Sequence, residues 1–141
     1  MPPAPPAASQ ASRLTGLMQG LKACLNKCCG ESGLSRDQIV DRLNGIANAA
    51  GVKLTAGNSK GLSLATLEKW LNPQNTDHPP SLVAVNALVL ALGDHRPLAH
   101  LLEIHGLQLM DEQDRFALEY GAACLAAREA AQKIKKMEAQ L

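Results

Sequence analysis

A short polar face on residues 63–72 carries the side chains whose types and spacing best fit a chemical task. Ser63, Ala65, Thr66 and Lys69 fall on one side of a helix drawn through this segment, away from its leucines. Hydroxyl and ammonium groups donate hydrogen bonds to phosphates and base edges, and a helix of this size fits the major groove of DNA. The segment is therefore predicted to read double-stranded DNA.

Basic and polar residues that precede this segment could contact the DNA backbone. Residues 13–60 carry seven Lys or Arg against three Asp or Glu, a net +4, whereas residues 61–114 carry two against seven, a net −5. A positive surface beside a reading helix favours phosphate contacts. The candidates for these contacts are Arg36, Arg42, Lys53, Asn58 and Lys60.

The four cysteines are the alternative source of chemistry. Cys24 and Cys28 share a face of the first expected helix, Cys29 follows them, and Cys124 lies far along the chain. Four thiols could bind zinc, but the spacing includes no Cys-x-x-Cys pair and no histidine at finger spacing. The cysteines are therefore predicted to be ordinary packed thiols, with no metal and no cofactor.

Residues for catalysis are not grouped in the sequence. The histidines stand at loop edges or on a short helix, without a nucleophile or paired carboxylates beside them. Gly57 and Gly61 lack the spacing and the following Lys-Ser/Thr of a phosphate-binding loop. An enzyme is not expected. The histidines are His78, His95, His100 and His105.

Composition indicates a small helical protein. The chain has 141 residues, of which 46% are hydrophobic, but only one Trp, one Tyr and one Phe, so its core should consist mainly of Leu, Ala and Val. Apolar runs stay well short of the roughly 18 residues that span a bilayer, and residues 1–6 do not resemble a signal peptide. A soluble, cytoplasmic protein without a membrane partner is expected.

Periodicity and capping signals place the helices that would position the polar face. Ser35 with Gln38 three residues later is a capping-box signature, and Ser63 can cap the helix that follows it. Apolar spacings of three and four predict an all-α, helix-turn-helix bundle, and no segment alternates with a strand period. Residues 1–11 are a Pro/Ala-rich tail expected to be disordered, 12–110 form the helix-turn-helix domain, and 111–141 form a long last helix. Helices are expected at 12–29, 35–51, 63–72, 81–92, 97–104 and 111–141, with a loop at 52–62 and an apolar, fully buried helix at 81–92.

The last helix carries a stripe of small and larger apolar residues that runs to its end. Alanines allow two helix backbones to approach closely, so this stripe could form a parallel or antiparallel homodimer. The alternative is packing against Leu14, Leu17, Leu21 and Leu25 of the first helix. The stripe is Ala123, Ala126, Ala127, Ala130, Ile134, Met137 and Leu141.

The order and spacing of these segments resemble the small helix-turn-helix proteins of Mu-like transposable phages and prophages. The similarity covers residues 34–141, although residues 56–62 look inserted between the two motif helices. Residues 67–73 also resemble the recognition segment of temperate-phage repressors and activators. Both resemblances imply sequence-specific DNA binding in a phage regulatory region. The matching segments are 34–43, 51–55 and 64–70 for the motif, then 78–80, 90–94, 97–98 and 107–112.

The sequence thus favours a dimeric, phage-type DNA-binding transcription regulator that reads DNA with residues 63–72. The competing interpretation is a helical adaptor of a phage operon, which would use the same helices to bind a protein. Salt dependence separates the two, because phosphate contacts weaken steeply as salt rises.

Overall fold

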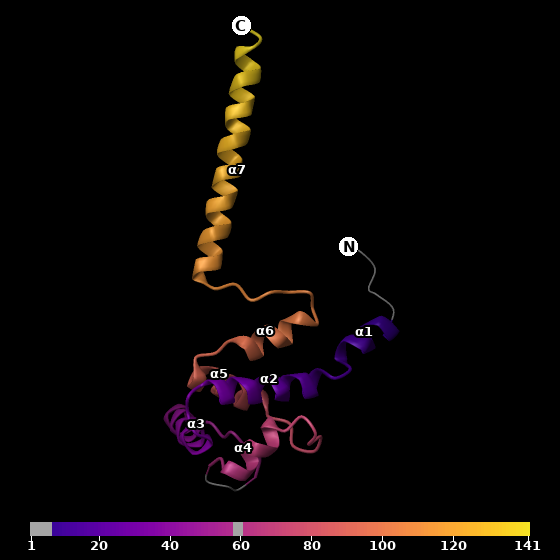
Figure 1. Ribbon diagram of the computed structural model, residues 1–141, viewed down its shortest axis with the longest axis vertical. Helices are drawn as coiled ribbons and strands as arrows, with labels where there is room; N and C mark the ends of the chain where they lie inside the picture. Colours follow the sequence, from indigo (N-terminus) through magenta and orange to yellow (C-terminus); the bar gives the residue numbers. More distant parts are fainter. Residues whose placement is uncertain (1–6, 58–60) are drawn as a thin grey trace. The chain divides into compact units, whose positions relative to one another are not determined.

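The computed structural model describes residues 7–57 and 61–141, and within these ranges every regular element is an α-helix (Figure 1). The all-α prediction is confirmed. None of the described helices is both long and apolar enough to cross a membrane. The helices are α1 (Ala7–Leu14), α2 (Leu17–Glu31), α3 (Arg36–Ala50), α4 (Leu64–Leu71), α5 (Leu82–Leu92), α6 (Arg96–Glu103) and α7 (Glu112–Glu138).

Contacts divide the chain into two units, one ending at Gln108 and the other beginning at Leu109. The second unit consists of α7 and the residues that flank it. Asp111 caps α7 through a capping box, in which its carboxylate accepts from the backbone N–H of Asp114 at 2.7 Å.

The start of the chain departs from the prediction in two respects. Residues 7–11, expected in the disordered tail, belong to α1. The reason is that the alanine-rich segment after Pro6 consists largely of good helix formers. The helix expected at 12–29 is broken at Gly16, whose φ of 75° is left-handed. The Arg13 guanidinium donates to the carbonyl of Ile104 at 3.2 Å, which joins α1 to the end of α6.

Serine caps begin the three helices in the middle of the chain, as two of the sequence signals predicted. Ser35 and Gln38 form the expected capping box at α3. Ser63 caps α4 and Ser81 caps α5, each accepting a backbone N–H three residues further on. Such caps satisfy amide groups that the first turn of a helix leaves unpaired.

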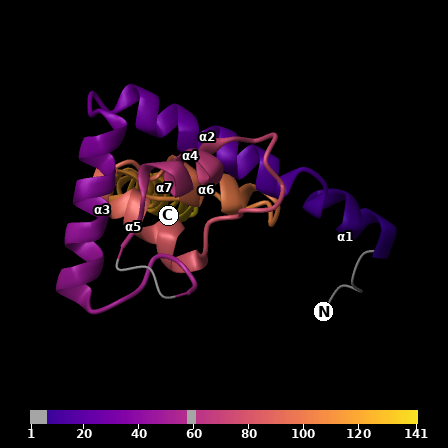
Figure 2. The same cartoon turned by 90° about the horizontal axis from the view of Figure 1, so that it is seen from below.

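The core of the first unit lies among α2, α3, α4 and α5. Helix α2 packs against α4, α5 and α6, and α3 packs against α4 and α5; Figures 1 and 2 show α2 passing across α4. The centre is mainly leucine and alanine, as predicted, with Trp70 as its one indole. Its most deeply buried leucines are Leu25, Leu43, Leu67 and Leu88.

Helix α5 is not buried on all sides, contrary to the prediction for residues 81–92. Ala84, Val85 and Leu88 face the core, but Leu82 and Leu90 are 76% and 72% exposed. Helix α5 packs against α2, α3 and α6, and Leu82 and Leu90 lie on the side that these helices leave exposed. The apolar character of the α5 residues therefore did not by itself predict which of them are buried.

Lys22 is a charged side chain inside the core, with 1% of its surface exposed. Its ammonium donates to the carbonyl of Lys69 at 3.1 Å and to the carbonyl of Asn75. Burial lowers its pKa, and Asp77 partly opposes that shift. The Lys69 carbonyl belongs to the last turn of α4, where carbonyls lack helical partners and a cation is favourable. Lys22 therefore fixes the end of α4 to α2.

Lys22→Met should lower the free energy of unfolding by about 2 kcal/mol, because two carbonyls lose a charged donor while the apolar stem is retained. Urea denaturation measures the change. Lys27→Met on the exposed side of the same helix is the control and should change stability little. Equal stability of the two variants would contradict the role given to the buried ammonium.

Candidate nucleic-acid interface

Helices α3 and α4 correspond to the two helices of the predicted motif, and they pack against each other. Helix α3 ends at Ala50, followed by Gly51 with a left-handed φ of 68°, and α4 begins at Leu64. The connection is much longer than the three or four residues of a minimal helix-turn-helix. The position of α4 therefore depends on contacts other than a tight turn.

Two buried leucines and one side-chain amide fix the described ends of this connection. Leu54 and Leu62 are each 5% exposed and belong to the core. The Asn44 amide pairs with the backbone of Leu62 in both directions: Nδ2 donates to its carbonyl at 3.0 Å, and Oδ1 accepts its N–H at 2.8 Å. A Cβ on Gly61 would lie 2.9 Å from Asn44 Oδ1, so a side chain there would crowd the pair. Asn44 thus holds the residue before the α4 cap.

The hydroxyls of Ser63 and Thr66 are engaged with each other at the start of α4. Ser63 Oγ accepts the Thr66 N–H at 3.2 Å and donates to Thr66 Oγ1 at 3.1 Å. Thr66 is half-buried and, with Trp70, lines a groove of about 510 Å³ whose other wall includes Pro79 and Pro80. The Thr66 side chain therefore faces this groove rather than the outer side of α4.

The outer side of α4 carries Ala65 and Lys69, both of which are exposed. Leu64, 40% exposed, and Glu68 share this side. Glu68 was not among the predicted site residues, although it follows Ala65 by three positions and therefore lies beside it on a helix. The face presents one cation, one anion and two apolar side chains.

The predicted backbone-contact residues differ in how the structure places them. Lys53 is exposed in the connection. The Arg36 guanidinium donates to Asn26 Oδ1 at 2.7 Å, and that of Arg42 donates to the Ala91 carbonyl at 3.3 Å near the end of α5. Both arginines therefore already have partners within the first unit. Asn58 and Lys60 lie outside the described residues.

The four cysteines differ in how deeply they are buried. Cys28 and Cys29 are buried, Cys24 is half-buried and Cys124 is exposed. Burial raises the pKa of Cys28 to about 12, and Cys24 and the Asp94 carboxylate add to the shift. Among the described residues, no group of three or more His, Cys, Asp or Glu side chains could hold a metal ion.

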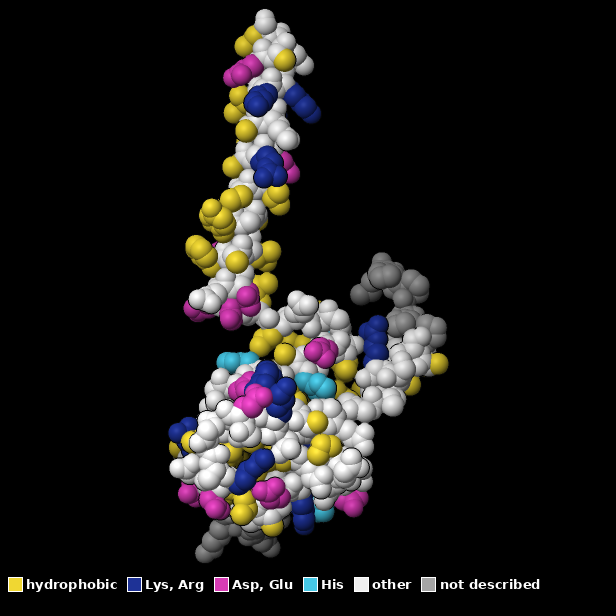
Figure 3. Space-filling view, in the orientation of Figure 1, with side chains coloured by type: hydrophobic (Ala, Val, Ile, Leu, Met, Phe, Trp, Pro, Cys, Tyr) yellow, Lys and Arg dark blue, Asp and Glu magenta, His cyan; other side chains and the backbone are white. Residues whose placement is uncertain are grey.

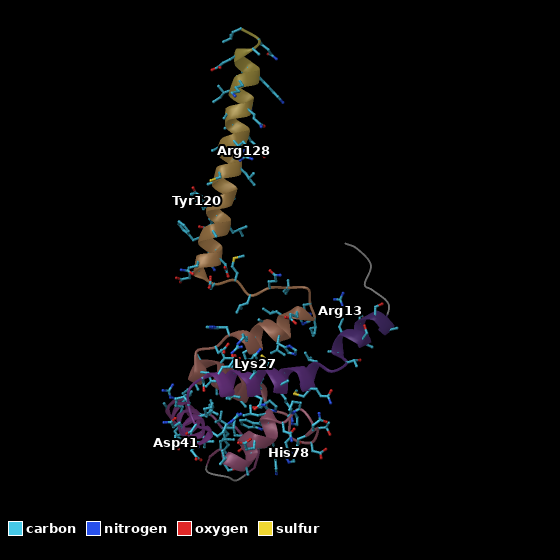
Figure 4. The ribbon with its side chains drawn as sticks, viewed as in Figure 1. Arg13, Lys27, Asp41, His78, Tyr120 and Arg128 are labelled. Carbon is cyan, nitrogen blue, oxygen red and sulfur yellow. The ribbon has the colours of Figure 1, made fainter. Side chains whose placement is uncertain are left out.

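Two of the four histidines, His78 and His100, contact neighbouring polar groups. His100 Nε2 lies 3.4 Å from the Leu17 carbonyl and packs against Gly20, where a Cβ would lie 2.7 Å from its ring. His78 Nδ1 lies 3.2 Å from Asn75 Oδ1, on the connection between α4 and α5 (Figure 4). Neither ring is paired with a nucleophile in these contacts.

Comparisons of the chain with protein-family models, with curated proteins and with solved structures give no match.

Asn44→Ala should destabilise the first unit by roughly 1 to 3 kcal/mol, because the buried backbone of Leu62 loses both hydrogen bonds. Hydrogen exchange should show faster exchange of the Leu62 amide and of the first turn of α4. Asn48→Ala, an exposed change one turn further along α3, is the control and should leave both unchanged. Unaltered protection of Leu62 in Asn44→Ala would disprove the anchoring contact.

Proposed function

We propose that this chain is a sequence-specific DNA-binding regulator that inserts the outer side of α4 into the major groove. The observation that carries the proposal is the presentation of this helix: its first turn is capped by Ser63, and Ala65 and Lys69 are exposed. The opposite side of the helix is fixed in the core through Leu67 and Leu71. A short helix held from behind and open in front is the arrangement that groove-reading motifs use.

Three exposed residues of α4 have matching partners on DNA. The Lys69 ammonium can pair with a phosphate or with guanine, and the Ala65 methyl fits against a thymine methyl. The Glu68 carboxylate can accept from the cytosine amino group. A carboxylate among phosphates disfavours non-specific binding, so Glu68 would raise the contribution of sequence to affinity.

The proposal includes a cytoplasmic homodimer joined through α7. One helix of eight residues reads few base pairs, and two linked copies gain affinity by occupying two half-sites together. Lys53 would add a phosphate contact beside α4. Arg36 and Arg42 would contribute only by exchanging their present partners for phosphates.

A helical adaptor that binds a protein is the second candidate. It is favoured by the exposed apolar side of α5, where Leu82, Val83 and Leu90 are 76%, 43% and 72% exposed. Exposed apolar patches of this kind are typical of protein–protein interaction sites.

Selection from a random duplex library with the full chain tests the proposal. One short enriched site is expected, and Lys69→Ala should weaken binding to it by roughly five- to tenfold and reduce the salt slope by about 0.9, the effect of one phosphate contact. Lys27→Ala, which removes an exposed lysine from α2 (Figure 4), is the charge-matched control and should bind as the parent does. Failure to enrich any site, or equal binding by the two variants, would favour the adaptor.

A further inference from the structure

The second unit presents a long helix with no buried residue among its described positions 112–138. Phe116 is 70% exposed, Tyr120 66%, Ile134 55% and Met137 60%. Figure 3 shows hydrophobic side chains along the visible side of this helix, and Figure 4 shows Tyr120 projecting from it. Two of the four leucines of the first expected helix that were the alternative partners of this stripe, Leu21 and Leu25, are buried within the first unit's own core.

A heptad seam runs along α7 from Phe116 onward. Its members recur at alternating spacings of four and three residues, the repeat at which one side of a helix faces a second helix in a coiled coil. Every position of this repeat is apolar from residue 116 to the end of the chain. The seam is Phe116, Tyr120, Ala123, Ala127, Ala130, Ile134 and Met137, and Leu141 continues the spacing beyond the helix.

A second apolar stripe on α7 is much shorter. Leu118 and Leu125 border a shallow hollow with Gly121 and Ala122, and Arg128 closes it. The next positions on that side, Glu129 and Gln132, are polar. Only the heptad seam is long enough to pair two helices along their whole length.

Charge complementarity identifies a second copy of this chain, in the opposite direction, as the occupant of the seam. The start of α7, residues 111–120, has four acidic residues against one basic, and residues 128–138 have four basic against two acidic. A parallel pair would place like charges together at both ends. An antiparallel pair places the acidic end against the basic end, and it also opposes the two helix dipoles.

The sizes of the seam side chains also favour an antiparallel pair of α7 helices, and they fix its register. A parallel pair would leave three consecutive alanine layers, at Ala123, Ala127 and Ala130, between bulky layers at both ends. The antiparallel pair sets a large residue against a small or medium one and leaves alanine against alanine only at the centre, which packs more evenly. Its layers are Phe116 with Leu141, Tyr120 with Met137, Ala123 with Ile134, and Ala127 with Ala130.

We propose that α7 is an antiparallel homodimerisation helix in which the heptad seam of one copy faces that of a second, with Ala127 opposite Ala130. This deepens the dimer part of the proposed function, but it rests on α7 alone and does not require DNA binding. Its failure and the failure of DNA recognition are therefore separate results.

Cysteine cross-linking of the full chain tests direction and register, in a Cys124→Ser parent. Ala123→Cys and Ile134→Cys are made as separate proteins. In the antiparallel register, a dimer of one variant holds its two new cysteines about 16 Å apart along the helix axis, at about 1.5 Å per residue. A mixed dimer places the new cysteine of one variant opposite that of the other. Disulfide dimers should form only when the two proteins are mixed. Dimers formed by each protein alone would establish a parallel pair, and none in either sample would overturn the seam.

Mass measurement by light scattering identifies the face without any new cysteine. The parent chain, before Ala127→Glu or Ala122→Glu is introduced, should have twice the 14.9 kDa mass of one chain. Ala127→Glu places a charge in the seam and should give the single-chain mass with α-helical circular dichroism retained. Ala122→Glu makes the same change on the other side and should stay dimeric. A monomeric parent, or dissociation by Ala122→Glu alone, would overturn the proposal.

Discussion

The arrangement of the first unit depends on holding an eight-residue helix in place. An isolated helix as short as α4 is unstable in water, so its position must come from its neighbours. Leu67, Trp70 and Leu71 supply the apolar contact, but apolar contact alone allows sliding and rotation. Two polar contacts remove that freedom: Asn44 on α3 holds the residue before the cap, and Lys22 on α2 holds the carbonyl of Lys69 near the other end.

Local capping signals predicted where α3 and α4 begin, whereas the break at Gly16 and the long-range contacts were missed. The caps at Ser35 and Ser63 involve residues three apart, so the sequence contains both partners. Asn44 and Lys22 bind groups 18 and 47 residues away, which no local pattern indicates. Both did leave a weak signal, since Lys22 stands among apolar spacings and Asn44 is a poor helix former within a helix. The exposed side of α5 could not be predicted, because its apolar residues surround the helix.

Hydrogen bonds within the first unit engage most of the basic residues of segment 13–60, although Arg13 and Arg42 remain exposed. Four of its seven basic residues have partners inside the first unit, where they join helices to one another. Lys27 and Lys53 are exposed as well, and Lys60 lies outside the described residues. The four engaged residues are Arg13, Lys22, Arg36 and Arg42.

The anchoring of Leu54 and Leu62 separates the placement of α4 from the number of residues between them. When both ends of a loop are fixed by their own contacts, changing its length alters mainly the entropy of closure, and doubling a flexible loop costs only about 0.6 kcal/mol. Homologous chains could therefore differ in length between these two leucines while keeping the same helix in the same position. The number of residues between 51 and 63 is thus a poor guide to relatedness. The features to align would be the leucines at 54 and 62 and the side-chain amide at residue 44.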